Sequence, residues 1–515
     1  MYSLQPTSQY DYSRKNWGSK KWLVKSAAWG GGAMTLREKI ARFVVTAPAH
    51  GSSPSNRFAA LRSRPPLAGR HRRNRFIGIV LAAGLLLSIC TPLGTSAASA
   101  AKLPPANDIG ITSKTITIGM IADVNTPVSP GLFQPSVNVM KAWAADVNAH
   151  GGLAGRKIVV DVCDSQLSPN PTTNCLIHAC SNDFALVGTA ALLITTFQNI
   201  DACKNEAGQA IGIPDLAGIS FGASEQCDKD TYAVTGVDPT FCATQNDTPQ
   251  TYTVQVGDYR YFLSKFKNLH GLWIYDSDIP TAKETQLPGY TEGSTLGIKQ
   301  NGLGFYPEAG TAPESALTPV VLAIKQFGAT YASDGATPAN FTLLRREALI
   351  QGVNTVKVWE CQAGCYTPVF IPNGGAAVNG TYNMEQTIPF YTECKLNHAL
   401  ALLAAQLGGT CSKIDSNSIG SFVEALLFQD AVQKIAASGK TLDRASLFAE
   451  LKNGEHSFTA DGVVGPTDVS NHKLSPCFMM VEVIKGKWQR VYPTKPGTLD
   501  CSSKNLVTFQ YNGKS

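Results

Sequence analysis

Short apolar runs alternate with amphipathic segments from Thr115 onward. The first run, Thr115–Asp123, is rich in β-branched residues and suits a strand buried in a parallel sheet. Apolar residues then recur every three or four positions from Val137 to Val147, the spacing of one helix face, until Gly151-Gly152 ends the segment. Because this strand-then-helix order repeats along the chain, the pattern predicts an α/β fold with largely parallel sheets.

The loops that follow the expected strands are small and polar, and they fall into two groups, one in each half of the chain. Since ligands of parallel sheets bind where such loops converge, this grouping predicts two lobes that face each other across a cleft. We expect further strands at residues 157–162, 184–192, 211–218, 271–276, 329–333 and 356–360. The expected helices lie near residues 175–180, 198–206, 316–327, 340–352, 396–406, 417–437 and 443–452. A hairpin is expected at residues 477–491, with its turn at Lys485-Gly486.

The residues before this pattern have the organisation of an export signal. Phe76–Cys90 is apolar and uncharged, and it is shorter than the roughly 20 residues that span a bilayer as a helix. The basic segment Arg70–Arg75 precedes it, and small residues ending in Ala98-Ser99-Ala100 follow it. This order is typical of a secretory signal peptide over residues 76–100, so we predict cleavage after Ala100 and no membrane span in the exported chain.

Other interpretations of this region stay open. The apolar run could be retained as a membrane anchor, Cys90 could carry a lipid, and Arg72-Arg73 could belong to a twin-arginine signal. Residues 1–75 are basic and lack sustained periodicity, so we interpret them as a non-structural extension, with Met34 as an alternative start. The expected location is exported: periplasmic, in the cell envelope or extracellular, with or without a lipid anchor.

Composition separates the basic extension from the exported part. Hydrophobic residues make up 43% of the 515 residues and charged ones 16%, which is enough apolar sequence for a sizeable folded core. Residues 1–75 hold 15 Lys and Arg against two acidic residues, whereas residues 101–515 hold 29 Lys and Arg against 36 Asp and Glu. The net charge of +6 therefore conceals a mildly acidic folded part, for which we expect no nucleic-acid partner.

The cysteines agree with export to an oxidising compartment, because twelve of the 13 follow the signal and twelve is an even number. Short separations favour four disulfides, and the four cysteines between residues 163 and 203 are left to pair among themselves. The favoured pairs are Cys361–Cys365, Cys227–Cys242, Cys394–Cys411 and Cys477–Cys501.

Cofactor sites find little support in the sequence. Cys175, His178 and Cys180 form a candidate metal cluster, but on a helix Cys180 lies roughly 140° around from Cys175. The exported chain has no CxxC pair of the zinc-binding type. No GxGxxG motif follows a strand and no GxxxxGK(S/T) motif occurs, so nucleotide chemistry has no visible site. We therefore expect neither a metal nor a cofactor.

A secreted esterase is the main enzymatic alternative. Gly218–Gly222 matches G-x-S-x-G, the nucleophile elbow of α/β-hydrolases, with Ser220 as the nucleophile. A strong helix should follow such an elbow, whereas residues 223–230 look like a disulfide-tied loop, and no HGGG-type oxyanion segment occurs upstream. We therefore expect no enzyme activity. The candidate bases for this alternative are His270, His398, His456 and His472.

Two segments resemble substrate-binding proteins of the leucine/isoleucine/valine-binding type. Gly110–Asp123, GITSKTITIGMIAD, is similar to the opening of these mature proteins. Asn148–Val160, NAHGGLAGRKIVV, resembles their N-x-x-GG-x-x-GR-x-I segment, whose glycines end the first helix and open the second strand. The order of elements is also similar from about residue 110 to about residue 495.

The resemblance implies a type I periplasmic-binding-protein fold, with two Rossmann-like lobes joined by a three-crossing hinge. Lobe 1 would comprise residues 110–255 and 388–458, and lobe 2 residues 256–387 and 459–515. Such a protein captures a small organic solute, an amino acid or another carboxylate or amide, closes over it and delivers it to the permease of an ABC transporter. A ligand-sensing module is an alternative that the same binding physics allows.

The resemblance also implies where the solute binds. In lobe 1, Thr189 would offer a hydroxyl and Ala190 a backbone N–H group to a carboxylate. In lobe 2, an acidic side chain would suit a ligand ammonium group. The apolar loop 189–196 differs from the serine-rich loop of amino-acid binders, so a less polar solute fits equally well. The predicted site comprises Thr126, Thr189, Ala190, Gly218, Ile219, Ser220, Asp278, Thr281, Asp334 and Glu360.

Three of these residues have simpler structural interpretations. Ser220 could cap the next helix, Asp334 could form a turn with Gly335, and Glu360 could be a solvated residue beside the Cys361–Cys365 loop.

Overall fold

The computed structural model describes residues 105–511, apart from 127–128, 195–196, 221, 236–237, 245, 278–281, 309–312, 336 and 362–363. The side chains of residues 223, 239, 282–288 and 301–308 are also outside this description. Several predictions therefore fall outside the described residues. They concern the N-terminal extension, the signal peptide with Cys90 and the cleavage after Ala100, and the site residues Asp278 and Thr281.

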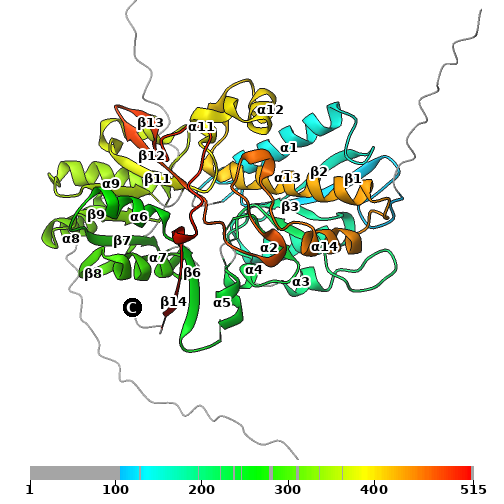
Figure 1. Cartoon of the computed structure of the whole chain (residues 1–515), viewed down its shortest axis with the longest axis horizontal. Coiled ribbons are helices and arrows are strands. Elements are labelled where there is room, and N and C mark those ends of the chain that lie inside the picture. Colours follow the sequence, from blue (N-terminus) through cyan, green and yellow to red (C-terminus); the bar gives the residue numbers. More distant parts are fainter. Residues whose placement is uncertain are drawn as a thin grey trace, which may run out of the picture. The chain divides into compact units, whose positions relative to one another are not determined.

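Five parallel strands form the first sheet (Figure 1). They are β1 (Thr115–Ala122), β2 (Lys157–Asp164), β3 (Leu186–Thr189), β4 (Asp215–Ala217) and β5 (Thr231–Tyr232). Their order in the sheet is β2-β1-β3-β4-β5, and β1 is buried over most of its length, as its apolar, β-branched sequence predicts. Gly119 of β1 lies beside Asp161 of β2 on one side and Leu186 of β3 on the other.

Helices cover both faces of this sheet. On one face α1 (Gln134–Ala149) packs beside α13 (Ser416–Ala437), although the two helices are far apart in sequence (Figure 1). Val137, Met140 and Ala144 of α1 are buried, which confirms the helix face predicted from their spacing. On the other face α2 (Pro169–Asn182) and α3 (Gln198–Asp201) enclose a separate apolar cluster.

Seven strands form the second sheet, in the order β13-β12-β11-β10-β9-β7-β8. They are β7 (His270–Asp276), β8 (Lys299–Glu308), β9 (Tyr331–Asp334), β10 (Val358–Cys361), β11 (Thr381–Glu385), β12 (Met479–Ile484) and β13 (Lys487–Tyr492). The strands from β8 to β11 run parallel, whereas β12 and β13 form an antiparallel hairpin. Lys485 and Gly486 both have positive φ, which confirms the predicted hairpin turn.

The second sheet also carries helices on both faces. α6 (Gly257–Lys265) and α7 (Ala282–Leu296) cover an aromatic cluster that includes Phe262, Trp273 and Tyr331. α8 (Thr318–Gln326) and α9 (Pro338–Ile350) contribute to the aliphatic core on the opposite face. This arrangement of two α/β lobes confirms the predicted fold class.

Smaller elements complete the chain. A two-stranded antiparallel sheet pairs β6 (Gln250–Gln255) with β14 (Leu506–Tyr511) near the C-terminus. The short α-helices are α4 (Ala223–Gln226), α5 (Pro239–Thr244), α10 (Phe370–Gly374), α11 (Phe390–Glu393), α12 (His398–Gln406) and α14 (Arg444–Asn453). The 3-10 helices are Glu314–Leu317, Gly375–Val378, Cys394–Leu396, Cys411–Lys413, Ala460–Gly462, Val469–Asn471 and Ser503–Asn505.

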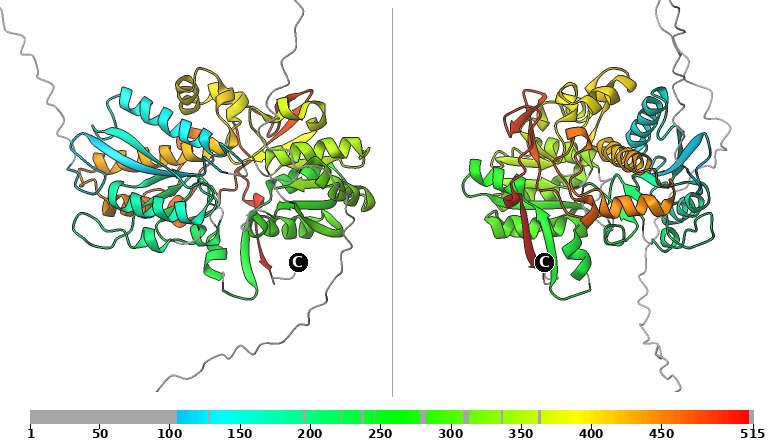
Figure 2. Two further views of the ribbon diagram at one scale, coloured as in Figure 1. Left: turned by 180° about the vertical axis from the view of Figure 1, so that it is seen from behind. Right: turned by 45° about the vertical axis from the view of Figure 1, so that its right-hand side comes forward.

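The chain passes between the two lobes three times, after β5, after β11 and after α14 (Figure 2). Hydrogen bonds tie these crossings together. The Ile388 N–H donates to the Val463 carbonyl at 2.8 Å, which joins the second crossing to the third. The buried Asn505 accepts from the Val256 N–H at 2.7 Å and donates to the Pro476 carbonyl at 2.9 Å, which joins the first to the third.

Six disulfides use all twelve cysteines from Cys163 to Cys501. The four favoured pairs are confirmed, and the remaining cysteines pair as Cys163–Cys175 and Cys180–Cys203. Because Cys175 and Cys180 are oxidised, neither has a thiolate to offer a metal. The candidate cluster of these two cysteines with His178 is therefore wrong.

Several predicted element boundaries need correction. The helix expected at 198–206 ends at Asp201, and the strand expected at 211–218 is confined to Asp215–Ala217. Gly208 and Gly212 have positive φ, so the intervening chain turns instead of continuing either element. The pattern also missed α7, β8 and β11 altogether.

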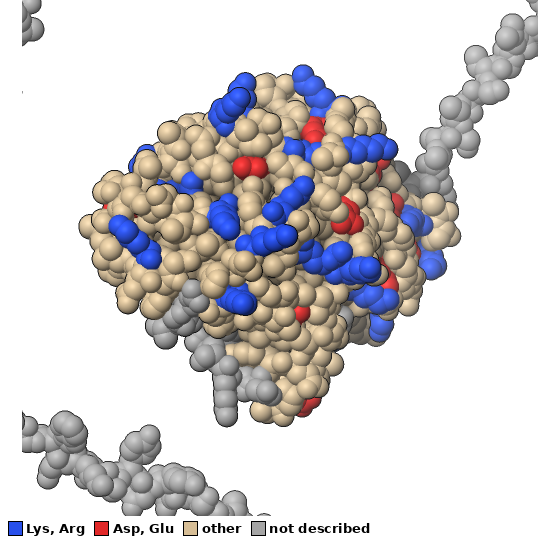
Figure 3. All heavy atoms as spheres, turned by 60° about the vertical axis from the view of Figure 1, so that its left-hand side comes forward, with Lys and Arg blue, Asp and Glu red and all other residues tan. Residues whose placement is uncertain are grey.

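Among the described residues, no helix combines the length and the apolar character that a membrane crossing requires. On the face shown in Figure 3, Lys and Arg side chains are scattered over a largely uncharged surface.

Candidate functional site

Asp123 organises the strand ends of the first lobe. It follows β1 directly, and its fully buried carboxylate accepts from the Ser165 hydroxyl at 2.6 Å and from the Leu192 N–H at 2.8 Å. The Leu167 N–H donates to it as well, at 2.7 Å. One carboxylate therefore holds the loops after β1, β2 and β3 together, which gives a binding surface built from loops a fixed shape.

The loop after β1 is held by a second carboxylate. Asp164, at the end of β2, accepts from the backbone of Val124 and from the side chain of Asn125. Partial burial raises the pKa of Asp164, but these hydrogen bonds outweigh it, so its pKa lies below the usual value. The predicted site residue Thr126 follows in this loop, is buried, and accepts from the Ser129 N–H at 2.9 Å.

Thr189 and Ala190 lie at the end of β3, where the sequence places them, but their polar groups already have partners. The Thr189 hydroxyl donates to Asp215 at 2.7 Å, and the Ala190 N–H donates to the Ile121 carbonyl at 2.8 Å. Burial raises the pKa of Asp215 to about 7, a rise that the Thr189 hydrogen bond opposes. Both groups stabilise the lobe in this structure, and their role toward a solute stays a prediction.

The loop after β4 lies against the end of β3 and against α13. The Ile219 N–H donates to the Thr189 carbonyl at 3.1 Å, so these two predicted residues are adjacent. A Cβ on Gly218 would lie 2.8 Å from the backbone nitrogen of Ser421, and the Ser421 hydroxyl donates to the Gly188 carbonyl at 2.8 Å. Glycine is therefore required at residue 218, because α13 approaches the loop too closely for a side chain.

Ser220 presents a polar group without a partner at this loop. Its Oγ atom is buried and forms no hydrogen bond, although the residue as a whole is only partly buried. Among the predicted lobe 1 residues, Ser220 is thus the one whose hydroxyl forms no hydrogen bond within the described part of the chain, whereas Thr126 accepts one and Thr189 donates one. No described histidine bonds to this hydroxyl, and α4 after it has only four residues, so the geometry of a nucleophile elbow is not formed here.

In lobe 2, Asp334 is the last residue of β9 and Glu360 the last but one of the neighbouring β10, and both are buried. Asp334 pairs in register with Cys361, the residue after Glu360. Glu360 is only 1% exposed and accepts a hydrogen bond from the Tyr331 hydroxyl, so its interpretation as a solvated residue is wrong. Burial raises the pKa of Glu360 well above its usual value, and the neighbouring Asp258 raises it further.

The two lobes meet at the N-terminus of α13. Ser416, in the first turn of this helix, donates to Glu385 at the end of β11 at 2.8 Å and to the Tyr366 carbonyl at 3.2 Å. Burial raises the pKa of Glu385 to about 8, with Asp415 adding to the rise and the Ser416 hydrogen bond opposing it. A carboxyl that is protonated near neutral pH therefore lies at the contact between the lobes.

This geometry predicts that Glu385→Gln reduces the pH dependence of stability. The folded state favours the protonated carboxyl, so its contribution is complete below the ordinary pKa of about 4.5 and is lost as the pH rises through about 8. Glutamine cannot ionise, so the variant should lose less stability than the wild type between about pH 5 and about pH 8.5. Urea unfolding across this range measures the effect, with the exposed Glu206→Gln as control. Parallel curves for Glu385→Gln and the wild type would contradict the prediction.

A cavity of about 500 Å³ lies elsewhere, between α13 and residues 454–461. None of the predicted site residues lines it. Its main cation, Lys434, is paired with Asp430 and with Glu455, both at 2.8 Å. The positive charge of Lys434 is therefore compensated within the protein, and the cavity is distinct from the strand-end loops.

The two-lobed α/β fold agrees with the result of a comparison with protein families. The model of the periplasmic binding protein family matches residues 115–195 and 289–487, which is more than half of the chain. The chain belongs to this family. A search of curated protein sequences found no match.

Solved structures of periplasmic binding proteins share the fold. A fatty acid ABC transporter substrate-binding protein from Thermomonospora curvata is 18% identical, with 76% of this chain and 98% of that chain covered and a TM-score of 0.59. A leucine-binding protein from Thermotoga maritima is 14% identical, with 73% of this chain and 97% of that chain covered and a TM-score of 0.55. A branched-chain amino acid ABC transporter protein from Thermus thermophilus with bound valine is 13% identical, with 77% and 98% covered and a TM-score of 0.58.

Membership in the periplasmic binding protein family assigns the chain to an extracytoplasmic class of solute-binding proteins. The predicted site residues leave out three acids that bond the loops at the strand ends, namely Asp123, Asp164 and Glu385. Each of them is an acid at the carboxyl end of a parallel strand, and this position was the one available signal.

Proposed function

We propose that this periplasmic binding protein captures a small organic solute between its two lobes and delivers it to the permease of an ABC transporter. The proposed site comprises the residues predicted from the sequence: Thr126, Thr189, Ala190, Gly218, Ile219, Ser220, Asp278, Thr281, Asp334 and Glu360. The observation that carries the proposal is the buried, unpartnered hydroxyl of Ser220 at a strand-end loop of a family member. Such a hydroxyl is costly to bury unless a ligand completes its bonding.

The surroundings of Ser220 favour a carboxylate with an apolar body. Ala190, Ala191 and Leu192, in the loop beside it, are all buried. The similar proteins named above bind or transport, according to their descriptions, fatty acid, leucine and valine, and each of these solutes combines a carboxylate with an apolar chain. A hydroxyl donor among apolar side chains suits that combination.

A thermal-shift screen tests this function. A solute that binds only the folded chain at 100 times its Kd stabilises it by about 2.7 kcal/mol, so the melting temperature of residues 101–515 should rise by several degrees. The panel includes L-leucine, L-valine, octanoate and palmitate, with an ester substrate assayed on the same sample. If no amino acid, carboxylate or amide in the panel changes the melting temperature, the result argues against the proposal. If the wild type hydrolyses the ester and Ser220→Ala does not, the protein is an esterase instead.

Ser220→Ala is expected to weaken carboxylate binding at least tenfold, because a hydrogen bond to a charged group contributes about 1.5–3 kcal/mol. The variant should fold with unchanged or slightly higher stability in the absence of solute, since it removes a hydroxyl that has no partner. Calorimetric titration with the best solute of the screen gives the affinities. Ser438→Ala, at the exposed end of α13, is the matched control and should bind like the wild type. Equal affinity in the two variants would remove Ser220 from the site.

A further inference from the structure

Three side chains with metal-binding chemistry meet on the outer face of the first sheet. Asp161 belongs to β2, His178 to α2, and Asp183 to the turn between α2 and β3. One ligand atom of each residue lies within 4.8 Å of the other two. The His178 Nε2 atom is 2.8 Å from a carboxylate oxygen of Asp161. None of the three belongs to the proposed solute site.

The first sheet makes room for this cluster by means of a glycine. Gly119 of β1 lies beside Asp161 in the register of the two strands. A Cβ atom on Gly119 would lie 2.4 Å from the Oδ2 atom of Asp183, which is too close for any residue other than glycine. The missing side chain therefore admits the Asp183 carboxyl to the position next to Asp161, and two acidic groups share a small space.

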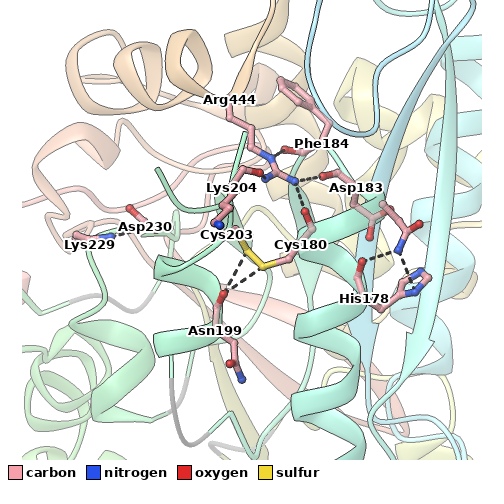
Figure 4. The surroundings of a disulfide bond; sticks show 11 residues. His178, Cys180, Asp183, Phe184, Asn199, Cys203, Lys204, Lys229, Asp230 and Arg444 are labelled. Atoms are coloured by element: carbon pink, nitrogen blue, oxygen red, sulfur yellow. Dashed lines mark hydrogen bonds and ion pairs between the residues drawn. A yellow bond between two sulfur atoms is a disulfide. The ribbon is translucent and has the colours of Figure 1, made fainter. Parts of the chain in front are cut away.

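Asp183 is buried without a partner for one of its carboxylate oxygens. The residue is only 1% exposed, and its Oδ1 atom forms no hydrogen bond. The positive charge of the nearby Arg444 offsets part of the charge of Asp183, but its guanidinium donates to backbone carbonyls, among them that of Asp183 itself, and not to this oxygen (Figure 4). A buried carboxyl beside a second carboxylate is costly unless a cation accompanies it.

We propose that Asp161, His178 and Asp183 bind one divalent transition-metal ion, with Zn²⁺ as the best match. One imidazole nitrogen and two carboxylate oxygens are a three-ligand protein set for zinc, and water can occupy the fourth position. The side chains of His178 and Asp161 are 48% and 38% exposed, so the ion and its water can enter from solvent. Mg²⁺ and Ca²⁺ prefer six or more oxygen ligands, which this cluster does not supply.

The bound ion would join α2 to the sheet at a place that disulfides already frame. Cys163–Cys175 links β2 to α2, and Cys180–Cys203 links α2 to the segment after α3. These bridges hold β2 and α2 together in the absence of metal, whereas the direct hydrogen bond between His178 and Asp161 must open when both side chains bind the ion. The ion would add stability to lobe 1 by mass action.

Titration of the purified, chelator-treated protein with ZnCl₂ tests the proposal. We expect one Zn²⁺ per chain, and His178→Ala and Asp183→Asn should each weaken binding at least tenfold, the lower end of the loss seen when the surroundings of a metal are changed. His456→Ala is the matched control, because His456 also lies 2.9 Å from an aspartate, Asp468, but belongs to no cluster of three metal ligands among the described residues. MgCl₂ should give no comparable response.

A second measurement separates binding from damage to the fold. Without metal, Asp183→Asn should melt at or above the wild-type temperature, because it removes the charge of a buried carboxyl that has one oxygen without a hydrogen bond. With Co²⁺ as a spectroscopic probe, visible ligand-field bands should appear in the wild type and disappear in His178→Ala. Absence of one-to-one Zn²⁺ binding, or equal Zn²⁺ affinity in the wild type and His178→Ala, would overturn the proposal and leave the solute-binding function untouched.

Discussion

Arg444→Met is expected to lower the free energy of unfolding by about 4 kcal/mol or more, because each buried polar group left without its partner costs about 1–3 kcal/mol. Arg444 is fully buried at the start of α14. Its guanidinium donates to the carbonyls of Cys180, Asp183, Phe184 and Lys204, which lie at the end of α2 and around the Cys180–Cys203 disulfide (Figure 4). Methionine fills a similar volume but satisfies none of these carbonyls.

Urea unfolding followed by circular dichroism measures this loss. Arg346→Met is the matched control, because Arg346 is exposed and donates to a single carbonyl, that of Asn373. The control should change stability by less than about 1 kcal/mol, as surface substitutions usually do. If Arg444→Met cost no more than Arg346→Met, the guanidinium would not be the link between α14 and α2 that its hydrogen bonds indicate.

Removing the Cys477–Cys501 disulfide by a double serine substitution is expected to cost about 3.5 kcal/mol. This bridge closes a loop with a sequence separation of 24, whereas Cys361–Cys365 has a separation of 4. The chain-entropy model gives a loss of roughly 3.5 kcal/mol for the longer loop and roughly 2 kcal/mol for the shorter one. The longer bridge also fixes the C-terminal segment to the third crossing, where Asn505 bonds to Pro476.

The two double variants, Cys477→Ser with Cys501→Ser and Cys361→Ser with Cys365→Ser, form the comparison. Their unfolding in urea, without reductant, gives the two losses under the same conditions. A larger loss of stability for the Cys477–Cys501 variant than for the Cys361–Cys365 variant would support loop closure as the dominant effect. A larger loss for the short loop would show that local packing around Cys361, a fully buried residue, outweighs it.

The parallel strands and the disulfides could be predicted because their signals are local. The β-branched run of β1, the helical spacing of Val137, Met140 and Ala144, and the turn at Lys485-Gly486 each act within a few residues. The favoured cysteine pairs had separations of 4 to 24 residues, and loop closure over short distances is the least costly. The family resemblance added the three crossings, which no local pattern contains.

The elements that were missed depend on contacts distant in sequence. α7 contains Gly289 and Gly293, which argue against a helix, yet a Cβ on Gly293 would lie 3.0 Å from Trp273 and close to Tyr259. Glycine is thus used there for close packing onto aromatic rings, a tertiary effect that overrides helix propensity. β6 and β14 pair across most of the second half of the chain, which no pattern within either strand indicates.

The predicted site shows the same limit. The sequence placed Thr189, Gly218 and Ser220 on neighbouring loops, and the structure brings these loops together. Which hydroxyl already has a partner could not be foreseen, because the bond from Thr189 to Asp215 and the lack of one at Ser220 depend on side-chain packing between strands. The assignment of all ten residues to a solute site stays a prediction.

Hydrogen–deuterium exchange with and without the best solute of the screen tests the central claim most directly. If the solute binds between the lobes, amide protection should increase together at the lobe 1 loops 189–194 and 218–220 and at the lobe 2 strand ends around 333–335 and 360–361. Protection confined to one lobe, or to the cavity formed by α13 and residues 454–461, would contradict a site between the lobes.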